Sequence, residues 1–443
     1  MDIIILTLLA ISLILFFGFF AEFIFRKFNI PDVLFLIILG FVIGPYSLNY
    51  VSPDNLVNVA PIFTTFALVF LLFDGAFNIR LASLIREFSQ SFLLTVYNFL
   101  ISSIIITGLI WGVGHFMMGG IPFLTSLLAG FLLGGVSSAF VIPVLKQMNI
   151  SDNVYSLLAL ESALTDVFCI VFSLTVIELI NLGSFGLQNT LAQLASLFAV
   201  AGLIGLIAGV IWIVLVLKVF KEHNYMMAVA YLLLVYVLAE FLNGNGAIAA
   251  LFFGIMLKNS KPLSSILKGI LSKKTEEKKE ALQGELGVSV TTPSEVYFYH
   301  QISFFLKVFF FVYIGILIDL SDWKALVLGL IISLVLMFSR SASSLLTRKM
   351  QELNRGLVNA IFARGLAAAA IAVMAVQAGI PHAEFISKVA YVVITGTIVL
   401  SSIRVFWIKI KMSRLKKNEE TSKPKEKTLK EKKKNKRSKP KKK

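Results

Sequence analysis

Long apolar runs that alternate with short polar breaks make up most of this sequence. The hydrocarbon core of a bilayer is about 30 Å thick, and a helix needs about 20 apolar residues to cross it. Thirteen runs are predicted to cross, and they cover residues 2–25, 31–48, 60–79, 91–114, 122–145, 153–179, 191–217, 225–242, 245–257, 301–318, 324–347, 356–378 and 384–408. The sequence therefore predicts an all-α membrane protein with 13 transmembrane helices.

The composition agrees with lipid as the solvent. Charged residues make up only 15% of the 443 residues, and the mean hydropathy is +0.86, whereas a soluble domain carries about 25% charged residues. The single cysteine, Cys169, excludes an intramolecular disulfide and a cysteine metal cluster. The four histidines show no metal-binding spacing, so we expect neither an enzyme nor a bound cofactor.

The positive charge is concentrated at the C-terminus. Residues 409–443 contain 16 Lys and 2 Arg against 4 Glu, which accounts for 14 of the net charge of +16. A lysine-rich segment without apolar periodicity is predicted to be an unfolded tail. Contact with anionic lipid headgroups is the expected role, and binding of a nucleic acid or an acidic protein is the alternative.

The polar breaks also predict the orientation. Breaks after the odd-numbered runs contain Lys or Arg, whereas breaks after the even-numbered runs contain almost none, with Lys324 as the exception. Short cytoplasmic loops concentrate these residues. We therefore expect the N-terminus outside, the C-terminus in the cytoplasm, and a multi-pass protein of the cell membrane.

Few ionisable residues lie deep inside the predicted helices. An ionisable side chain in a membrane helix costs a few kcal/mol on insertion scales, so each one is a candidate for function. The deep candidates are Asp74 in the third run, Glu161 and Asp166 in the sixth, Arg340 in the eleventh and Arg364 in the twelfth.

The two acids of the sixth run point in different directions. At 100° per residue Glu161 lies about 140° away from Asp166, so each needs a partner of its own. Glu161 and Arg340 both lie about 12 Å from the cytoplasmic ends of their helices. Equal depth and opposite charge predict a buried ion pair that holds two helices together, and direct contact of Glu161 with the transported ion is the alternative.

Asp166 has no obvious basic partner in the sequence. Ser162 lies one turn earlier on the same face. Burial disfavours the charged form of a carboxyl group, so Asp166 is predicted to hold either a proton or a cation. One site that both ions must share couples their movements; the alternative is an acid that hydrogen bonds satisfy.

Two of the predicted helices contain residues that interrupt helices. Segment 130–143 combines three glycines, a proline and the serines Ser137 and Ser138, and Arg364 is followed by Gly365 in the twelfth run. Interrupted helices in corresponding places of two halves are typical of inverted-repeat transporters. Arg364 is predicted to neutralise the carbonyl ends of these half-helices, or simply to anchor its own helix.

These residues form five motifs along the chain, which are Pro31–Pro45, Leu71–Gly75, Glu161–Asp166, Ala239–Gly254 and Ala363–Gly365. Their order and placement resemble the NhaP-type sodium/proton antiporters of archaea and bacteria, within the monovalent cation:proton antiporter superfamily. The resemblance covers nearly all of residues 1–408. It implies exchange of Na⁺, or Li⁺, for H⁺ and a role in pH homeostasis.

The resemblance also implies the residues of the site. Asp166 corresponds to the carboxylate that binds Na⁺ and the proton, and Ser162, Asp74, Ser137 and Ser138 correspond to its helpers. The resemblance further implies that Glu161 pairs with an arginine, which matches Arg340.

Two departures from the family pattern bear on the choice of ion. Thr165, itself an expected site residue, replaces the usual Asn, and residues 137–140 replace the Thr-Asp-Pro of many relatives. A K⁺/H⁺ antiporter is therefore the alternative, and a cation channel is a remote one. A neutral residue beside Asp166 resembles the electroneutral class with one-for-one exchange.

The family's fold implies a homodimer. In such a fold the core formed by helices 4–6 and 11–13 moves like an elevator against a dimerisation domain formed by helices 1–3 and 7–10. On this interpretation residues 1–408 form the antiporter domain, and residues 409–443 form the basic tail.

Overall fold

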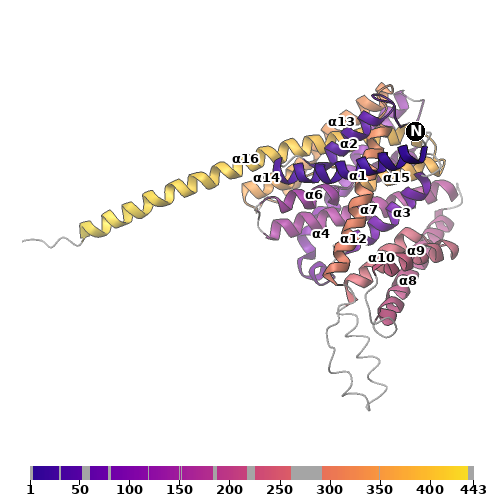
Figure 1. The fold of residues 1–443 in the computed structure, drawn as a ribbon, viewed down its shortest axis with the longest axis horizontal. Helices are drawn as coiled ribbons and strands as arrows, with labels where there is room; N and C mark the ends of the chain where they lie inside the picture. The colour runs from indigo at the N-terminus through magenta and orange to yellow at the C-terminus, as the bar shows by residue number, and fades with distance from the viewer. Residues whose placement is uncertain are drawn as a thin grey trace, which may run out of the picture.

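The computed structural model describes residues 3–28, 31–51, 60–77, 81–117, 119–148, 150, 152–182, 187–216, 225–260, 292–348 and 350–437. These residues form helices and connecting turns, with no strand among them. The helices form a bundle, and the C-terminal half of α16 projects from it (Figure 1). A helix satisfies its backbone N–H and C=O groups with its own hydrogen bonds, and this is required in lipid, which offers no partners for them.

The helices of the first half, in chain order, are α1 (Ile3–Phe28), α2 (Asp32–Ile43), α3 (Ala60–Ala76), α4 (Leu81–Met117), α5 (Phe123–Leu132), α6 (Ser138–Lys146), α7 (Asp152–Leu182) and α8 (Leu187–Leu215). Those of the second half are α9 (Tyr225–Phe241), α10 (Gly246–Lys258), α12 (Pro293–Leu317), α13 (Trp323–Ser339), the 3-10 segment η4 (Arg340–Leu345), α14 (Glu352–Ala360), α15 (Leu366–Gln377) and α16 (Ala383–Arg437).

Each predicted run overlaps a helix or a pair of consecutive helices in the described residues. Six described helices are long and apolar enough to cross a membrane, and seven further apolar helices are shorter, with 10–17 residues. The prediction of an all-helical membrane protein is therefore confirmed.

Several predicted boundaries differ from the helix ends by several residues, and the start of α12 shows why. α12 begins at Pro293 rather than at residue 301. Thr292 Oγ1 accepts a hydrogen bond from the backbone N–H of Glu295 at 3.1 Å, and the Glu295 carboxylate accepts one from the N–H of Thr292 at 3.3 Å. This capping box satisfies two backbone donors and starts the helix before its apolar stretch. Residues 261–291 of the loop that precedes it lie outside the described residues.

The C-terminal segment also differs from the expected unfolded tail. α16 continues without a break to Arg437 and projects far beyond the bundle (Figure 1). Lys and Glu are good helix formers, and extending an existing helix avoids the cost of nucleating a new one. Charge alone therefore did not predict the conformation of this segment.

Two glycines explain the close packing of α2 against α12. A Cβ atom on Gly40 would lie 2.0 Å from the backbone O of Val312, and one on Gly315 would lie 2.2 Å from the O of Ile37. Only residues without a Cβ allow two backbones to approach so closely. The first glycine motif of the sequence therefore has a packing role.

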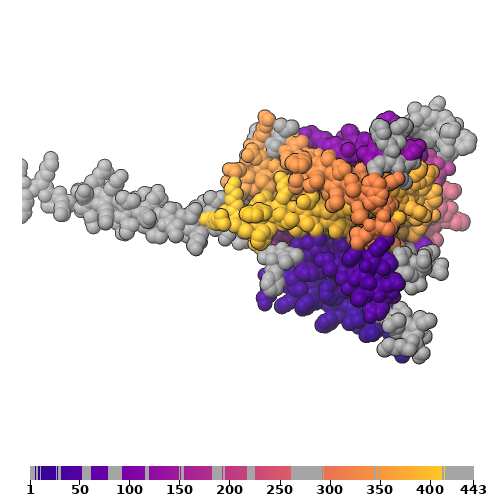
Figure 2. Space-filling model, turned by 90° about the horizontal axis from the view of Figure 1, so that it is seen from above, coloured from indigo at the N-terminus to yellow at the C-terminus, as the bar shows by residue number. Residues whose placement is uncertain are grey.

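The interrupted helices lie within the bundle. α15 packs against α3, α7 and α16, and nearly all of its side chains are buried. α5 packs against α4 and α7. Figure 2 shows α16 (yellow) between α13 and α14 (orange) on one side and the N-terminal helices (indigo) on the other. The breaks between α5 and α6 and between α14 and α15 therefore lie inside the bundle rather than at its surface.

Candidate functional site

Two non-helical segments meet inside the bundle. One is residues 133–137, between α5 and α6, and the other is residues 361–365, between α14 and α15. The N–H of Ser137 donates to the carbonyl of Ala363 at 2.9 Å. A Cβ on Gly365 would lie 2.0 Å from Ser137 Oγ, so glycine is required at this approach. Both predicted interruptions are present, and they touch each other.

The carboxylate of Asp166, a residue of α7, meets the start of α6. Its Oδ2 accepts a hydrogen bond from the backbone N–H of Ser138 at 3.1 Å and another from Ser138 Oγ at 2.5 Å. The N-terminal end of a helix carries unsatisfied N–H groups and a partial positive charge, which suit an anion. Both donors are neutral, and no ion pair of Asp166 is found among the described residues.

Thr165 fixes the same segment from α7. Its Oγ1 accepts from the N–H of Val136 at 3.0 Å and lies 3.2 Å from the carbonyl oxygens of Val136 and Ser162. One turn further along α7, Cys169 Sγ accepts from the N–H of Gly135 at 3.0 Å. α7 therefore holds the broken segment through side chains on both sides of Asp166.

Arg364 crosses from the second broken segment to the first. Its guanidinium donates to the carbonyl of Gly135 and, at 3.0 Å, to Ser102 Oγ. Its backbone N–H donates to Thr397 Oγ1 at 3.0 Å. The side chain is buried, with 2% exposed. This guanidinium lies just beyond the C-terminal end of α5, where a helix carries a partial negative charge.

Glu161 and Arg340 form a buried bidentate pair. The oxygen–nitrogen distances are 2.5 and 2.8 Å. Asn98 Nδ2 also donates to Glu161 at 2.8 Å, and Ser343 Oγ donates to Asn98 Oδ1 at 2.7 Å. The Nε of Arg340 donates to the carbonyl of Val358 at 2.9 Å. This network joins α4, α7, η4 and α14.

The remaining expected site residues are not joined to Asp166 by hydrogen bonds. Ser162 Oγ donates to the carbonyl of Ala159 at 3.0 Å. Ser137 Oγ is buried beside Gly365 and has no hydrogen-bond partner among the described residues. Of the nearby serines that the sequence singled out, only Ser138 is bonded to the carboxylate.

Asp74 lies in a different place from the one expected. It is in the last turn of α3. Its carboxylate accepts from Ser303 Oγ at 2.7 Å and lies 3.1 Å from Nδ1 of His300, both on α12. No hydrogen bond joins it to Asp166 in the described part of the chain, so it forms a second polar cluster.

The comparison with protein families covers most of the chain. Residues 11–411 match the family described as sodium/hydrogen exchanger, transmembrane. The chain belongs to this family. It is therefore a multi-pass membrane protein of a transporter family rather than an enzyme, and the resemblance seen in the motifs is confirmed.

Similarity to individual proteins agrees with this family assignment. The chain is 27% identical over 174 residues to a probable Na⁺/H⁺ antiporter 3, and 30% identical over 181 residues to Na⁺/H⁺ antiporter 1, both from Methanocaldococcus jannaschii. These matches cover 38% and 40% of this chain and 42% and 39% of the relatives. A K⁺/H⁺ antiporter NhaP of Alkalimonas amylolytica is 23% identical over 265 residues, which are 59% of this chain and 45% of that protein. The matches thus span less than half of each relative's length.

A solved structure has the same fold. The sodium proton antiporter MjNhaP1 from Methanocaldococcus jannaschii at pH 8 superposes with a TM-score of 0.70. The match covers 90% of this chain and 100% of that one at 21% identity. The sequence similarity is low, so this match establishes the fold alone.

Several residues around Glu161, Arg364 and Asp74 were not found from the sequence. They are Asn98, which bonds Glu161, Ser102, which bonds the Arg364 guanidinium, Thr397, which bonds the Arg364 backbone, and the Asp74 contacts His300 and Ser303. An amide inside an apolar run, such as Asn98, was a usable signal, because it needs a partner there. The others are ordinary residues of membrane helices, and only the tertiary fold assigns their roles.

Proposed function

We propose that the chain exchanges a monovalent cation for a proton, and that both ions occupy Asp166 in turn. The observation that carries this proposal is the bonding of Asp166, whose two hydrogen bonds come from the neutral donor Ser138. Exclusion from water favours the neutral carboxyl, and hydrogen-bond donors favour the carboxylate. Because no cationic side chain pairs with it in the described part of the chain, Asp166 can neutralise its charge with either ion.

The proposed cation is Na⁺ or Li⁺. Both are hard cations that bind oxygen ligands, and the Asp166 carboxylate, Ser138 Oγ and the carbonyls of residues 133–137 supply oxygen. K⁺ in place of Na⁺ is the second candidate, supported by the similarity to a K⁺/H⁺ antiporter. Thr165 departs from the family's Asn, and it bonds the backbone that would supply the carbonyl ligands.

We further propose one-for-one, electroneutral exchange. Thr165 is neutral, so Asp166 is the one acid at this place in α7 and binds one charge at a time. The loaded site then carries the same charge with a proton as with a cation. Exchange is expected to be insensitive to the membrane potential.

Alternating access is proposed to follow the helix sets. The moving core comprises α4–α7 and α13–α16, and the dimerisation domain of a homodimer comprises α1–α3 and α8–α12, with the N-terminus outside. Both crossing segments belong to the proposed core, so the core carries the site as a unit. The contacts of α15 with α3 and of α16 with α2 lie on the proposed sliding interface.

The test is ion-driven proton flux into proteoliposomes loaded with a pH dye, with Na⁺, Li⁺ and K⁺ in turn. Asp166→Asn is expected to abolish coupled flux with every cation, because an amide neither takes up the proton nor supplies the charge. Glu352→Gln is the matched control, since Glu352 is an exposed acid on α14 that pairs with Lys411. This control is expected to retain the wild-type flux.

Each other outcome changes a specific part of the proposal. Full coupled flux in Asp166→Asn would overturn the assignment of Asp166 as the shared site of the cation and the proton. A stronger response to K⁺ than to Na⁺ would make the chain a K⁺/H⁺ antiporter. Cation current without proton coupling would indicate a channel, and a rate that follows an imposed potential would exclude electroneutral exchange.

A further inference from the structure

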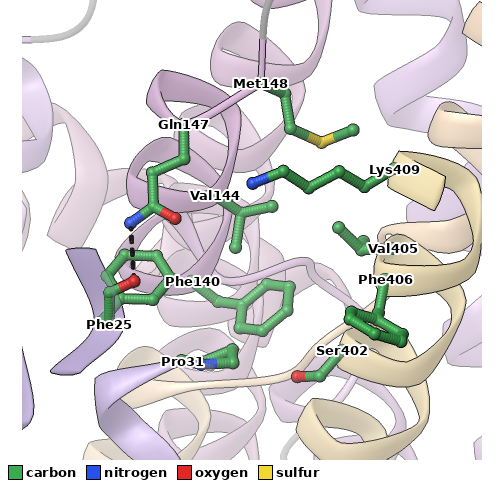
Figure 3. Close-up of a pocket in the computed structure, with 10 residues that line it drawn as sticks. All are labelled: Phe25, Pro31, Phe140, Val144, Gln147, Met148, Ser402, Val405, Phe406 and Lys409. Carbon is green, nitrogen blue, oxygen red and sulfur yellow. Dashed lines mark hydrogen bonds between the residues drawn. The ribbon is translucent and has the colours of Figure 1, made fainter. Parts of the chain in front are cut away.

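A shallow groove separates two sets of helices at one end of the bundle. The end of α1 and the start of α2 form one wall, and α6 and α16 form the other (Figure 3). Seven of its ten lining residues are apolar, one is a cation and none is an acid. The enclosed volume is only about 20 Å³, so an occupant must lie mostly along the outer surface rather than inside.

From its exposed side chains, we expect the groove to open towards the bilayer near the headgroup level. Phe406 lines it and is 55% exposed, and its neighbours Ile403 and Trp407 are also exposed on α16. Exposed apolar side chains on a membrane-spanning helix face lipid. Trp is typical of the level where hydrocarbon meets headgroups, and Trp407 lies near the end of the apolar part of α16. The groove is therefore in contact with lipid rather than with a soluble ligand.

A lysine supplies the charge at this level. Lys409 lies one turn beyond Val405, and its side chain reaches across the groove so that the ammonium lies near Gln147 and Val144 (Figure 3). The amide of Gln147 donates to the backbone O of Phe25 at 3.3 Å, which ties the two walls together. An ammonium above an apolar surface matches an anionic headgroup above an acyl chain.

We propose that this groove binds an anionic phospholipid. The headgroup lies at Lys409, and the upper part of an acyl chain lies against Phe140 and Phe406. One wall belongs to the proposed dimerisation domain and the other to the proposed core, so the lipid contacts both. Binding does not require ion exchange at Asp166, and this inference goes beyond the proposed function.

The test is lipid binding to the full-length protein, measured by native mass spectrometry from a neutral detergent. The probes are phosphatidylglycerol, phosphatidylcholine with the same acyl chains, and inorganic phosphate. Wild type is expected to bind phosphatidylglycerol most tightly. Lys409→Gln is expected to weaken that binding about fivefold, since one lysine near an anionic headgroup contributes about that factor, and to leave phosphatidylcholine binding unchanged.

Lys411→Gln is the matched control, because Lys411 lies two residues further along α16 and pairs with Glu352 at 2.8 Å. It is expected to keep wild-type affinity for phosphatidylglycerol. An equal loss in both variants would show general surface charge and overturn the proposal. It would also be overturned by equal binding of the two phospholipids, or by inorganic phosphate competing with phosphatidylglycerol.

A second variant tests the apolar part of the groove. Val144→Phe fills it without a change of charge, and it is expected to weaken binding of both phospholipids; unchanged binding of both would contradict the acyl-chain assignment. Thermal unfolding of each variant shows that it is folded. Proton flux of the same samples in phosphatidylcholine vesicles reports separately on the exchange function.

Discussion

Glu161 and Asp166, both on α7, have different partners. Glu161 is bonded through both oxygens to Arg340, a permanent cation, and receives a third bond from Asn98. Asp166, five residues later, receives bonds from the neutral Ser138 alone among the residues that the structure describes. A guanidinium fixes the charge of Glu161, whereas Asp166 has neutral donors, as the proposed exchange of its counter-ion requires. On the proposed function, the partners of the two acids, rather than burial alone, distinguish a structural acid from a transporting one.

Breaking the Glu161–Arg340 pair is expected to have the largest effect. Arg340→Gln leaves Glu161 buried without its cation, and removal of one partner of such a pair costs about 3–5 kcal/mol. Asp166→Asn leaves an amide that still accepts a bond from Ser138, so its stability is expected to stay near that of wild type. Thermal unfolding in detergent measures both variants.

The double variant Glu161→Gln with Arg340→Gln controls for the loss of the arginine side chain itself. It is expected to recover much of the stability, because no unpaired charge remains. If Asp166→Asn lowered the melting temperature as much as Arg340→Gln did, the charge of Asp166 would also be structural. The contrast between the two acids would then not hold.

Two serines near Asp166 sharpen the comparison. Ser138→Ala removes the hydroxyl bonded to Asp166, and a hydrogen bond to a charged group contributes about 1.5–3 kcal/mol. We expect the cation KM to rise about tenfold or more. Ser162→Ala removes a hydroxyl that bonds the backbone of its own helix, so KM is expected to stay within about twofold of wild type.

Proton flux at graded cation concentrations gives both KM values. The carboxylate remains in both variants, so each is expected to retain some exchange. A larger effect of Ser162→Ala than of Ser138→Ala would contradict the geometry. It would favour the arrangement that the family motif implied.

Periodicity and depth predicted a good part of this molecule. The helices followed from the length of the apolar runs, and the breaks near Ser138 and Gly365 followed from residues that interrupt helices. The meeting of Glu161 with Arg340 was predictable because two opposite charges at equal depth in lipid have few other partners. Each of these inferences uses a quantity that is measured along one helix.

Contacts between residues of different helices could not be predicted from the sequence in the same way. The sequence indicated that Asp166 needs polar partners. Ser162, on the same face of its own helix, is not bonded to it, whereas Ser138 from another helix is. Asp74 lies at the end of α3 beside His300. The sequence did not predict this position, because no change in hydropathy marks the end of α3. Contacts between helices depend on their rotation and crossing, which no local pattern specifies.

A third carboxylate, Asp319, extends the comparison to the surface, in the turn between α12 and α13. Lys388 Nζ lies 2.8 Å from Asp319 and 3.6 Å from Asp322, and the hydroxyls of Ser321 and Tyr46 also donate to Asp319. Partial burial acts to raise the pKa of Asp319, but the hydrogen bonds from Lys388, Ser321 and Tyr46 outweigh it and hold the pKa well below the ordinary value of 3.8.

A lowered pKa in the folded state means that Asp319 stabilises the fold above its ordinary pKa, and that this contribution is lost as the pH falls through and below that value. Asp319→Asn is expected to lower stability near pH 7 by about 1 kcal/mol or less, because the ion pair lies near water. The difference in melting temperature from wild type should shrink as the pH falls from about 5 towards 3. Lys388→Gln should show the same pH trend, because it removes the same pair. If the difference in melting temperature stayed constant with pH, Asp319 would act through its neutral hydrogen bonds. Its ion pair with Lys388 would then not contribute, and Asp319 would resemble Asp166 rather than Glu161.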